Sequence, residues 1–433
     1  MGRGGKLDQQ PTVYTFDEVS RHDKKGDRWI VIQDNVYDIT DWSNRHPGGS
    51  KVIGHYAGQD ATDAFEAFHN DLESVKRYLK PLHMGTVKDA KDKSIKEDFR
   101  KLRLTAVQMG LFKANFWYFA LYFLHVVVFE ILAYLTLYYF GSGWIPFVIS
   151  LLFYGTFQAQ SAFLSHDFGH LAVFHNTSMD RFFEYYLLAF NKGASPHWWN
   201  HMHFQHHAKP NVIGKDPDVR LDKFLVVGQV MPVEVAQSKN SYLPFNLQDK
   251  YFPLFGPTLL FPIYFHYTCY KHVLTRKLWV DLAVMIIYNI KFLFLFVPML
   301  GWGWTLVYYE AFRVIDSMWF AWVTQSNHIP MNIDHDDNKP WLKLQLFATC
   351  DHEQSLFNDW FTGRLNFQIE HHLFPTMPQH NLYKVRPLVQ ALCKKHGIPF
   401  QIKSLQRAFG DILRSLKDSG ELWSAAYHAH HLS

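Results

Sequence analysis

Histidine is concentrated in three short motifs of this sequence. The motifs are SHDFGH, HFQHH and QIEHH, and their candidate ligands are His166, His170, His203, His206, His207, Gln368, His371 and His372. Residues three or four positions apart share one face of a helix, so the spacing predicts that each motif presents its side chains in one direction. Imidazole nitrogen is a ligand for iron, zinc and copper. The motifs therefore predict metal chemistry.

The number of histidines predicts more than one metal ion. The motifs hold more imidazoles than one octahedral ion can bind, which favours two ions, and His328 in TQSNHIP is a further candidate ligand. The three cysteines of the chain lie far apart without CxxC spacing, which excludes an iron–sulfur cluster and a disulfide framework. A structural zinc site closes with fewer ligands, so the ligand set favours iron.

Gln368 stands where the pattern of HFQHH would place a histidine. It precedes His371 and His372 by the same spacing that separates His203 from His206 and His207. An amide carbonyl is a neutral and weaker ligand, which could bind iron directly or through water and leave a position open for O2. The alternative is that Gln368 only donates a hydrogen bond to a ligand.

A separate pair of histidines indicates a heme. His46 lies in RHPGG and His69 in AFHND, with several apolar residues between them. The two glycines let the backbone approach a flat macrocycle closely, and each wall of the pocket would supply one axial imidazole. Two axial ligands leave no open position on the iron, so this heme would transfer electrons rather than activate oxygen.

Composition and charge point to a protein that is partly in a membrane. The chain is 48% hydrophobic and 17% aromatic, yet its mean hydropathy is only −0.15, so apolar residues must be concentrated in one part. Four apolar stretches, at about 115–140, 143–165, 278–300 and 302–324, are long enough to cross a bilayer. The tips at 141–143 and 301–303 carry no basic residue, unlike the other loops, which predicts that both termini and all histidine motifs are cytosolic. The small net charge of +4 argues against nucleic acid as a partner.

The first 90 or so residues favour a small soluble domain. The alternating stretches WIVI and VYDIT, separated by the turn-like pair Asp34 and Asn35, predict strands in an α+β fold. After them, Ile95, Phe99 and Leu102 recur with helical spacing between charged residues. That pattern predicts a helix that lies on a membrane surface or serves as a solvated linker.

With HPGG and His69, HDFGH, HFQHH and the variant QIEHH, the sequence resembles a front-end fatty acid desaturase of the animal acyl-CoA type with a fused N-terminal cytochrome b5 domain. The resemblance covers essentially the whole chain. It implies a multidomain fold in which a small α+β cytochrome b5-like heme domain precedes an all-α integral membrane desaturase domain with four transmembrane helices and a cytosolic histidine-rich cap. The expected parts are an N-terminal tail (1–14), the heme domain (15–90), a linker or interfacial helix (91–113) and the desaturase domain (114–433).

The same resemblance implies the reaction and its components. The enzyme would insert a cis double bond between an existing double bond and the carboxyl end of a polyunsaturated fatty acyl-CoA. It would use heme b, two non-heme iron ions, O2 and electrons from NADH through cytochrome b5 reductase. The histidines of the three motifs would bind iron, as would His328 and Gln368 as further candidates, and His46 and His69 would be the axial heme ligands. The expected location is the endoplasmic reticulum membrane, with several spans and both termini in the cytosol.

Some alternatives remain open at the level of sequence. The stretch WWNHMHFQHH slightly favours delta-5 over delta-6 desaturation, by resemblance alone. A sphingolipid desaturase or a fatty acyl hydroxylase could use the same di-iron site. A heme-carrying membrane electron relay or transporter is a rival outside these enzyme classes, but it would leave three histidine motifs on one side without a purpose.

Overall fold

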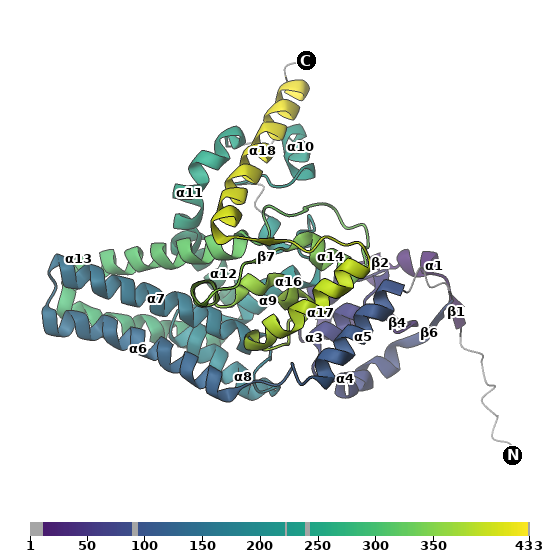
Figure 1. The fold of residues 1–433 in the computed structure, drawn as a ribbon, viewed down its shortest axis with the longest axis horizontal. Coiled ribbons are helices and arrows are strands. Elements are labelled where there is room, and N and C mark those ends of the chain that lie inside the picture. The colour runs from purple at the N-terminus through teal and green to yellow at the C-terminus, as the bar shows by residue number, and fades with distance from the viewer. Residues whose placement is uncertain (1–11, 89–93, 221–222, 239–242, 432–433) are drawn as a thin grey trace.

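The protein consists of a small sheet-containing domain, a long helical bundle and a cap of short helices that lies between them (Figure 1). This computed structural model describes residues 12–88, 94–220, 223–238 and 243–431. Most of the predicted N-terminal tail (1–11), the last two residues of the predicted heme domain (89–90) and the start of the predicted linker (91–93) lie outside the described residues.

The N-terminal domain is the predicted α+β fold. Its strands, in the order β1-β6-β4-β3-β2 with β5 beside β3, are β1 (Thr12–Tyr14), β2 (Asp23–Lys24), β3 (Asp27–Ile32), β4 (Asn35–Asp38), β5 (Gln59–Asp60) and β6 (His83–Val87). Its helices are α1 (Phe16–Ser20), η1 (Trp42–Arg45), α2 (Ser50–Gly54), α3 (Thr62–Phe68), α4 (Leu72–Leu79) and η2 (Lys80–Leu82). Gln33 and Asp34 form the turn between β3 and β4, both with positive φ, which matches the twist of the hairpin. The turn therefore lies one residue earlier than the sequence predicts.

Helix α5 (Ser94–Gln108) joins this domain to the rest of the chain, and its apolar face is buried in protein. Phe99 is 3% exposed, and its ring stacks on Phe374 of the cap with centroids 5.6 Å apart. Lys96, one turn away, pairs with Asp60 at 2.6 Å. The helix is therefore present as predicted, and its stripe of Ile95, Phe99 and Leu102 packs in protein. Its apolar stripe packs in the core that both domains share. The sequence pattern alone does not show whether such a stripe faces a protein core or a membrane surface.

Three helices in the described part of the chain are long and apolar enough to cross a membrane: α6 (Phe116–Phe140), α7 (Trp144–Gly169) and α13 (Trp279–Gln325). Gly301 interrupts α13 with non-helical angles, φ 70° and ψ 166°. The rings of Phe296 and Tyr308, on either side of this glycine, lie 4.9 Å apart, which a straight helix would not allow. α13 therefore consists of two antiparallel halves, and the bundle has four helical segments (Figure 1).

The cap is built from helices, turns and two short parallel strands that follow α7 and α13. They are α8 (Thr177–Glu184), η3 (Tyr185–Phe190), α9 (Pro196–Ala208), η4 (Pro217–Val219), α10 (Val230–Gln237), η5 (Phe245–Leu247), α11 (Gln248–Leu259), η6 (Leu260–Phe265), α12 (His266–Arg276), α14 (Trp341–Ala348), β7 (Asp351–His352), α15 (Leu356–Phe361), η7 (Leu365–Phe367), α16 (Gln368–Leu373), η8 (Gln379–Asn381), α17 (Leu382–Lys395), β8 (Ile402–Lys403) and α18 (Leu405–His431). In Figure 1, α9 and α16 lie between the bundle and the N-terminal domain.

We expect peptide tags inserted next to Ser142 and Trp302 to be protected from protease in sealed microsomes, because both tips lack basic residues. Tags at the two termini should be digested. Both tips follow glycines with positive φ, Gly141 and Gly301, so short insertions there leave the helices intact. A protected C-terminal tag would contradict this topology.

Candidate metal centre

Four segments bring the histidines of the cap together. His166 and His170 lie at the end of α7, and His328 follows the end of α13. The HFQHH motif lies on α9, which begins where the Ser195 side chain accepts a hydrogen bond from the backbone of Trp198 and Pro196 occupies the first turn. The QIEHH motif forms α16. All of these histidines are buried or half-buried.

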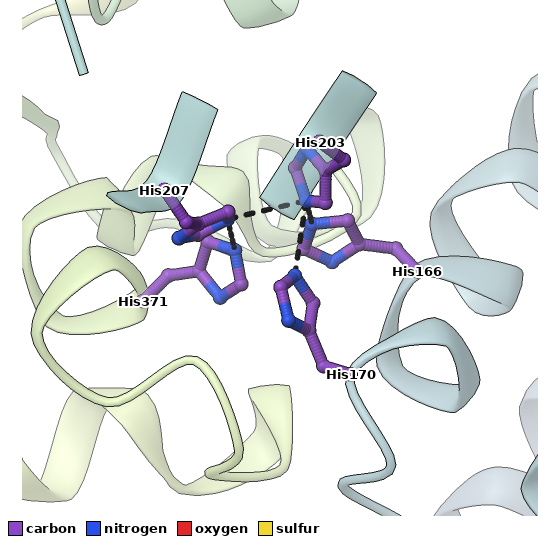
Figure 2. Close-up of side chains that lie close together, drawn as sticks. All are labelled: His166, His170, His203, His207 and His371. Carbon is purple, nitrogen blue, oxygen red and sulfur yellow. Dashed lines mark hydrogen bonds between the residues drawn. The ribbon is translucent and has the colours of Figure 1, made fainter. Parts of the chain in front are cut away.

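The first cluster contains five imidazoles from α7, α9 and α16: His166, His170, His203, His207 and His371 (Figure 2). Their ligand nitrogens all lie within 4.8 Å of one another. The Nε2 atom of His203 is 2.9 Å from those of His166 and His170 and 3.1 Å from that of His207. His371 closes the group, with Nε2 at 3.0 Å from Nε2 of His207.

The second cluster contains His206, His328 and His372, again with nitrogens within 4.8 Å of one another. The side-chain amide of Gln368 joins it, with Nε2 at 2.9 Å from His328 Nε2 and 3.2 Å from His372 Nε2. Adjacent histidines therefore go to different clusters, His206 and His207 in one case and His371 and His372 in the other. The prediction that each motif presents its imidazoles in one direction holds for SHDFGH, whose two histidines both lie in the first cluster. It is wrong for HFQHH and QIEHH, because each of these contributes to both clusters.

The donor set of both clusters fits metal ions. A ring nitrogen carries at most one hydrogen, so the Nε2 atom of His203 cannot make hydrogen bonds to all three of its neighbours at once. A cation between the rings would accept all of their lone pairs. In the second cluster, Oε1 of Gln368 is buried without a hydrogen-bond partner among the described residues. The amide nitrogen and oxygen are interchangeable by rotation, so this oxygen can face an ion there.

Hydrogen bonds behind the second cluster hold its rings with Nε2 directed inward. The Nδ1–H group of His206 donates to Asp216 at 2.9 Å, that of His328 donates to the carbonyl of Ala348 at 3.0 Å, and that of His372 donates to Gln345 at 3.0 Å. Such contacts select the tautomer whose Nε2 is free for a metal.

Burial keeps most of these imidazoles uncharged. Burial, followed by repulsion from neighbouring histidines, lowers the pKa of His203, His207, His371 and His372 well below the ordinary value. His206 differs: burial opposes its charged form, but the carboxylates of Asp216 and Asp218 raise its pKa to about 9. A cation at Nε2 would take the place of that extra proton, so the two carboxylates favour a positive charge at this end of the site.

A cavity with largely aromatic and aliphatic walls opens beside both clusters. It is lined by His166, His203, His206, His328 and Gln368 together with Phe163, Leu188, Trp198, Trp199, Phe261, Phe265 and Phe320. Trp199 also stacks on His203, with ring centroids 4.8 Å apart. An extended apolar molecule in this cavity would lie against the candidate metal ligands.

The N-terminal domain holds the second predicted site. The rings of His46 and His69 face each other with centroids 6.2 Å apart. Nδ1 of His69 donates to the carbonyl of Phe65 at 2.8 Å, and that of His46 donates more weakly to Gly49 at 3.4 Å. Two imidazoles that bind one ion from opposite sides, each through a bond of about 2 Å, would have their ring centroids roughly 6 Å apart. The pair therefore fits a heme iron. A Cβ atom at residue 48 would lie only 2.9 Å from Cε1 of His46, which explains why a glycine is found there.

Comparison with known protein families agrees with both sites. Residues 142–404 match the fatty acid desaturase family, which is more than half of the chain, and residues 15–88 match the cytochrome b5-like heme/steroid binding domain. The chain belongs to the fatty acid desaturase family. Among solved structures, it is similar to the cytochrome b5 of Ostreococcus tauri virus 2, with 39% identity, coverage of 17% of this chain and 95% of that chain, and a TM-score of 0.17.

This desaturase is therefore an oxygen-dependent oxidoreductase with a fused heme domain. Sequence reasoning did not find Asp216 and Gln345, which orient second-cluster histidines. Asp216 is fully buried and also accepts a hydrogen bond from the backbone of Asn211 at 2.7 Å. A carboxylate ten residues beyond a histidine has no helical relation to it, so only the folded loop reveals the contact.

We expect Asp216→Asn to weaken iron binding by about 10–100-fold, because the carboxylate that orients and polarises His206 is removed. The measurement is non-heme iron per protein after dialysis against graded chelator. Asp218→Asn is the matched control, since its carboxylate lies 3.6 Å from the same nitrogen, too far for a hydrogen bond. Asp218→Asn removes a charge near His206 but no hydrogen bond, so it should weaken iron binding less than Asp216→Asn does. Iron retention in Asp216→Asn equal to that of the parent enzyme would show that Asp216 has no such role.

For Gln368→Ala, we expect product formation to fall at least about tenfold while most of the iron is retained, because the imidazoles still hold the ions. His371→Ala should instead lose iron from the first cluster. Gln368→His should keep iron but react poorly, since imidazole is a stronger donor that would fill an open position. Iron content and product are measured on purified variants after subtraction of heme iron. Full activity and normal iron in Gln368→Ala would exclude both a ligand and an orienting role.

Proposed function

We propose that this desaturase is a front-end acyl-CoA desaturase of polyunsaturated fatty acid biosynthesis. It inserts a cis double bond between an existing double bond and the carboxyl end of the chain, and delta-5 is favoured over delta-6. The observation that carries the proposal is the packing of the heme domain directly against the cap that holds the histidine clusters, through one continuous apolar core. That arrangement suits an enzyme that carries its own electron donor.

The proposed site residues follow from the geometry described above. His46 and His69 would hold heme b, and the two histidine clusters with Gln368 would hold two iron ions. When bound, the iron ions would activate O2, the oxidant that is needed to remove hydrogen from an unactivated methylene. Overall, two hydrogens of the acyl chain, two electrons and two protons reduce O2 to two molecules of water. The electrons would come from NADH through cytochrome b5 reductase.

The residues of the chain would bind the substrate, orient it and exclude water. The aromatic walls of the cavity lie beside the metal ligands, so an acyl chain in contact with Phe163, Trp199 and Phe320 would be held against both clusters. Burial stabilises each methylene by about 0.8 kcal/mol, so full transfer of a long chain to water would cost on the order of 10 kcal/mol. A cavity reached from the bilayer would avoid that cost, which supports a location in a membrane. We propose that this is the endoplasmic reticulum membrane and that both termini are cytosolic.

The domain limits belong to the same proposal. Residues 15–90 would form the heme domain, residues 91–113 the connecting segment and residues 114–433 the membrane desaturase domain, with four crossings supplied by α6, α7 and the two halves of α13.

Expression in yeast fed individual polyunsaturated fatty acids tests the proposed function. We expect a new double bond on the carboxyl side of an existing one, with delta-5 products predominating, located by mass spectrometry. His46→Ala should lose the low-spin heme spectrum and most of the product, because one axial ligand is removed. Hydroxylated fatty acids would instead indicate a hydroxylase, and products confined to sphingoid chains would indicate a sphingolipid desaturase.

A further inference from the structure

The heme domain rests on the backbone next to the first-cluster histidines. The hydroxyl of Tyr56 donates to the carbonyl of Ala208 at 2.8 Å, and Ala208 follows His207. The side-chain amide of Asn70 donates to the carbonyl of Leu171 at 2.9 Å, and Leu171 follows His170. Two hydrogen bonds from the heme domain therefore end one residue away from candidate iron ligands.

A buried ionic group fixes this position further. Asp336 of the cap accepts hydrogen bonds from Gln59 of the heme domain at 2.9 Å and from Lys215 at 2.5 Å. Lys209, which is 1% exposed, donates to the side-chain oxygen of Gln59 at 2.7 Å and lies over the ring of Tyr56. Separation of the domains would leave the ion pairs of Asp336 in place, but it would remove the hydrogen bonds to Gln59 and the contact of Lys209 with the Tyr56 ring.

Aromatic rings fill the space between the two cofactor sites. Phe68 directly precedes His69, and its ring centroid is 6.3 Å from that of Phe204 on α9. Phe204 directly follows His203, and its ring is 6.0 Å from that of His170. Two packed rings thus connect the residue beside a candidate heme ligand to the first cluster.

We infer that Phe204, packed on Phe68, is a positioning residue for electron transfer and that electrons reach the metal centre at the first cluster. This inference rests on the proposed function, since it requires the heme and iron sites described above. The two contacts hold the His69 side of the heme pocket against His170. Electron transfer slows steeply with distance and across poorly packed gaps, so a ring at this position shortens the path through protein atoms.

The redox step balances without bond changes. Each transfer oxidises one ferrous heme iron to the ferric state and reduces one ferric non-heme iron to the ferrous state. Two such transfers supply the two electrons that the proposed reaction requires, and the reductase restores the ferrous heme between them.

The test measures heme reoxidation in the full-length enzyme that contains heme and iron. The heme is reduced by a short light pulse with a photoreductant under anaerobic conditions, and the decay of the ferrous heme absorption reports internal transfer. We expect Phe204→Leu to slow this decay several-fold, while heme midpoint potential, heme spectrum and iron content match the parent enzyme. Phe204→Tyr, which restores the ring, should recover the parent rate.

Phe99→Leu is the matched control, because Phe99 belongs to the same shared core but its ring packs on Phe374 rather than on Phe68 or Phe204. Hydrogen exchange of α3 and α9 reports whether the domains stay packed together. An unchanged decay in Phe204→Leu would overturn the inference. So would equal slowing in Phe99→Leu, since that would indicate general loosening. If the heme of the parent enzyme with full iron is not reoxidised at all, the proposed function itself fails.

Discussion

The structure depends on eight imidazoles buried with their nitrogens directed at one another. Neutral rings in this arrangement cannot satisfy each other by hydrogen bonds, and protonated rings would repel, so the cap needs cations at the two clusters. Asp216, Gln345 and the carbonyl of Ala348 hold the rings of the second cluster in the required tautomer. Ions bound at the two clusters would join helices from distant parts of the chain, since the histidines of each cluster come from different segments.

The membrane bundle explains why this centre can act on a lipid. α7 crosses the bundle and ends in His166 and His170, so the same helix spans the apolar region and supplies ligands at its end. α13 returns from Gly301 and leads to His328. The cavity with largely apolar walls lies between these ends and α9, beside the candidate metal ligands.

Much of the site could be predicted from the sequence, because histidine spacing and helical period are local properties. The spacing of its motif indicates Gln368, and a position just past the fourth apolar stretch indicates His328; the structure places both beside His372. The division of ligands between two clusters was not predictable, since a motif does not reveal which neighbouring helices face it. The apolar stripe of α5 was correctly read as a helix, but its partner is Phe374 of the cap rather than a membrane. Both failures concern tertiary contacts, which residues far apart in the chain decide.

Helix α5 contacts both the heme domain and the cap, so the orientation of the heme domain depends on which faces of this helix carry the two contacts. One end of this helix is tied to the heme domain by Lys96 and Asp60, and its middle is seated on the cap by Phe99. An α-helix rotates by about 100° for each residue, so one inserted residue between these contacts would turn them to different sides. A flexible linker would tolerate such a change. In α5, the number of residues between the two contacts determines how the heme domain is oriented relative to the cap. Insertions or deletions within α5 are thus constrained by geometry, although none of its residues is a candidate ligand of either cofactor site.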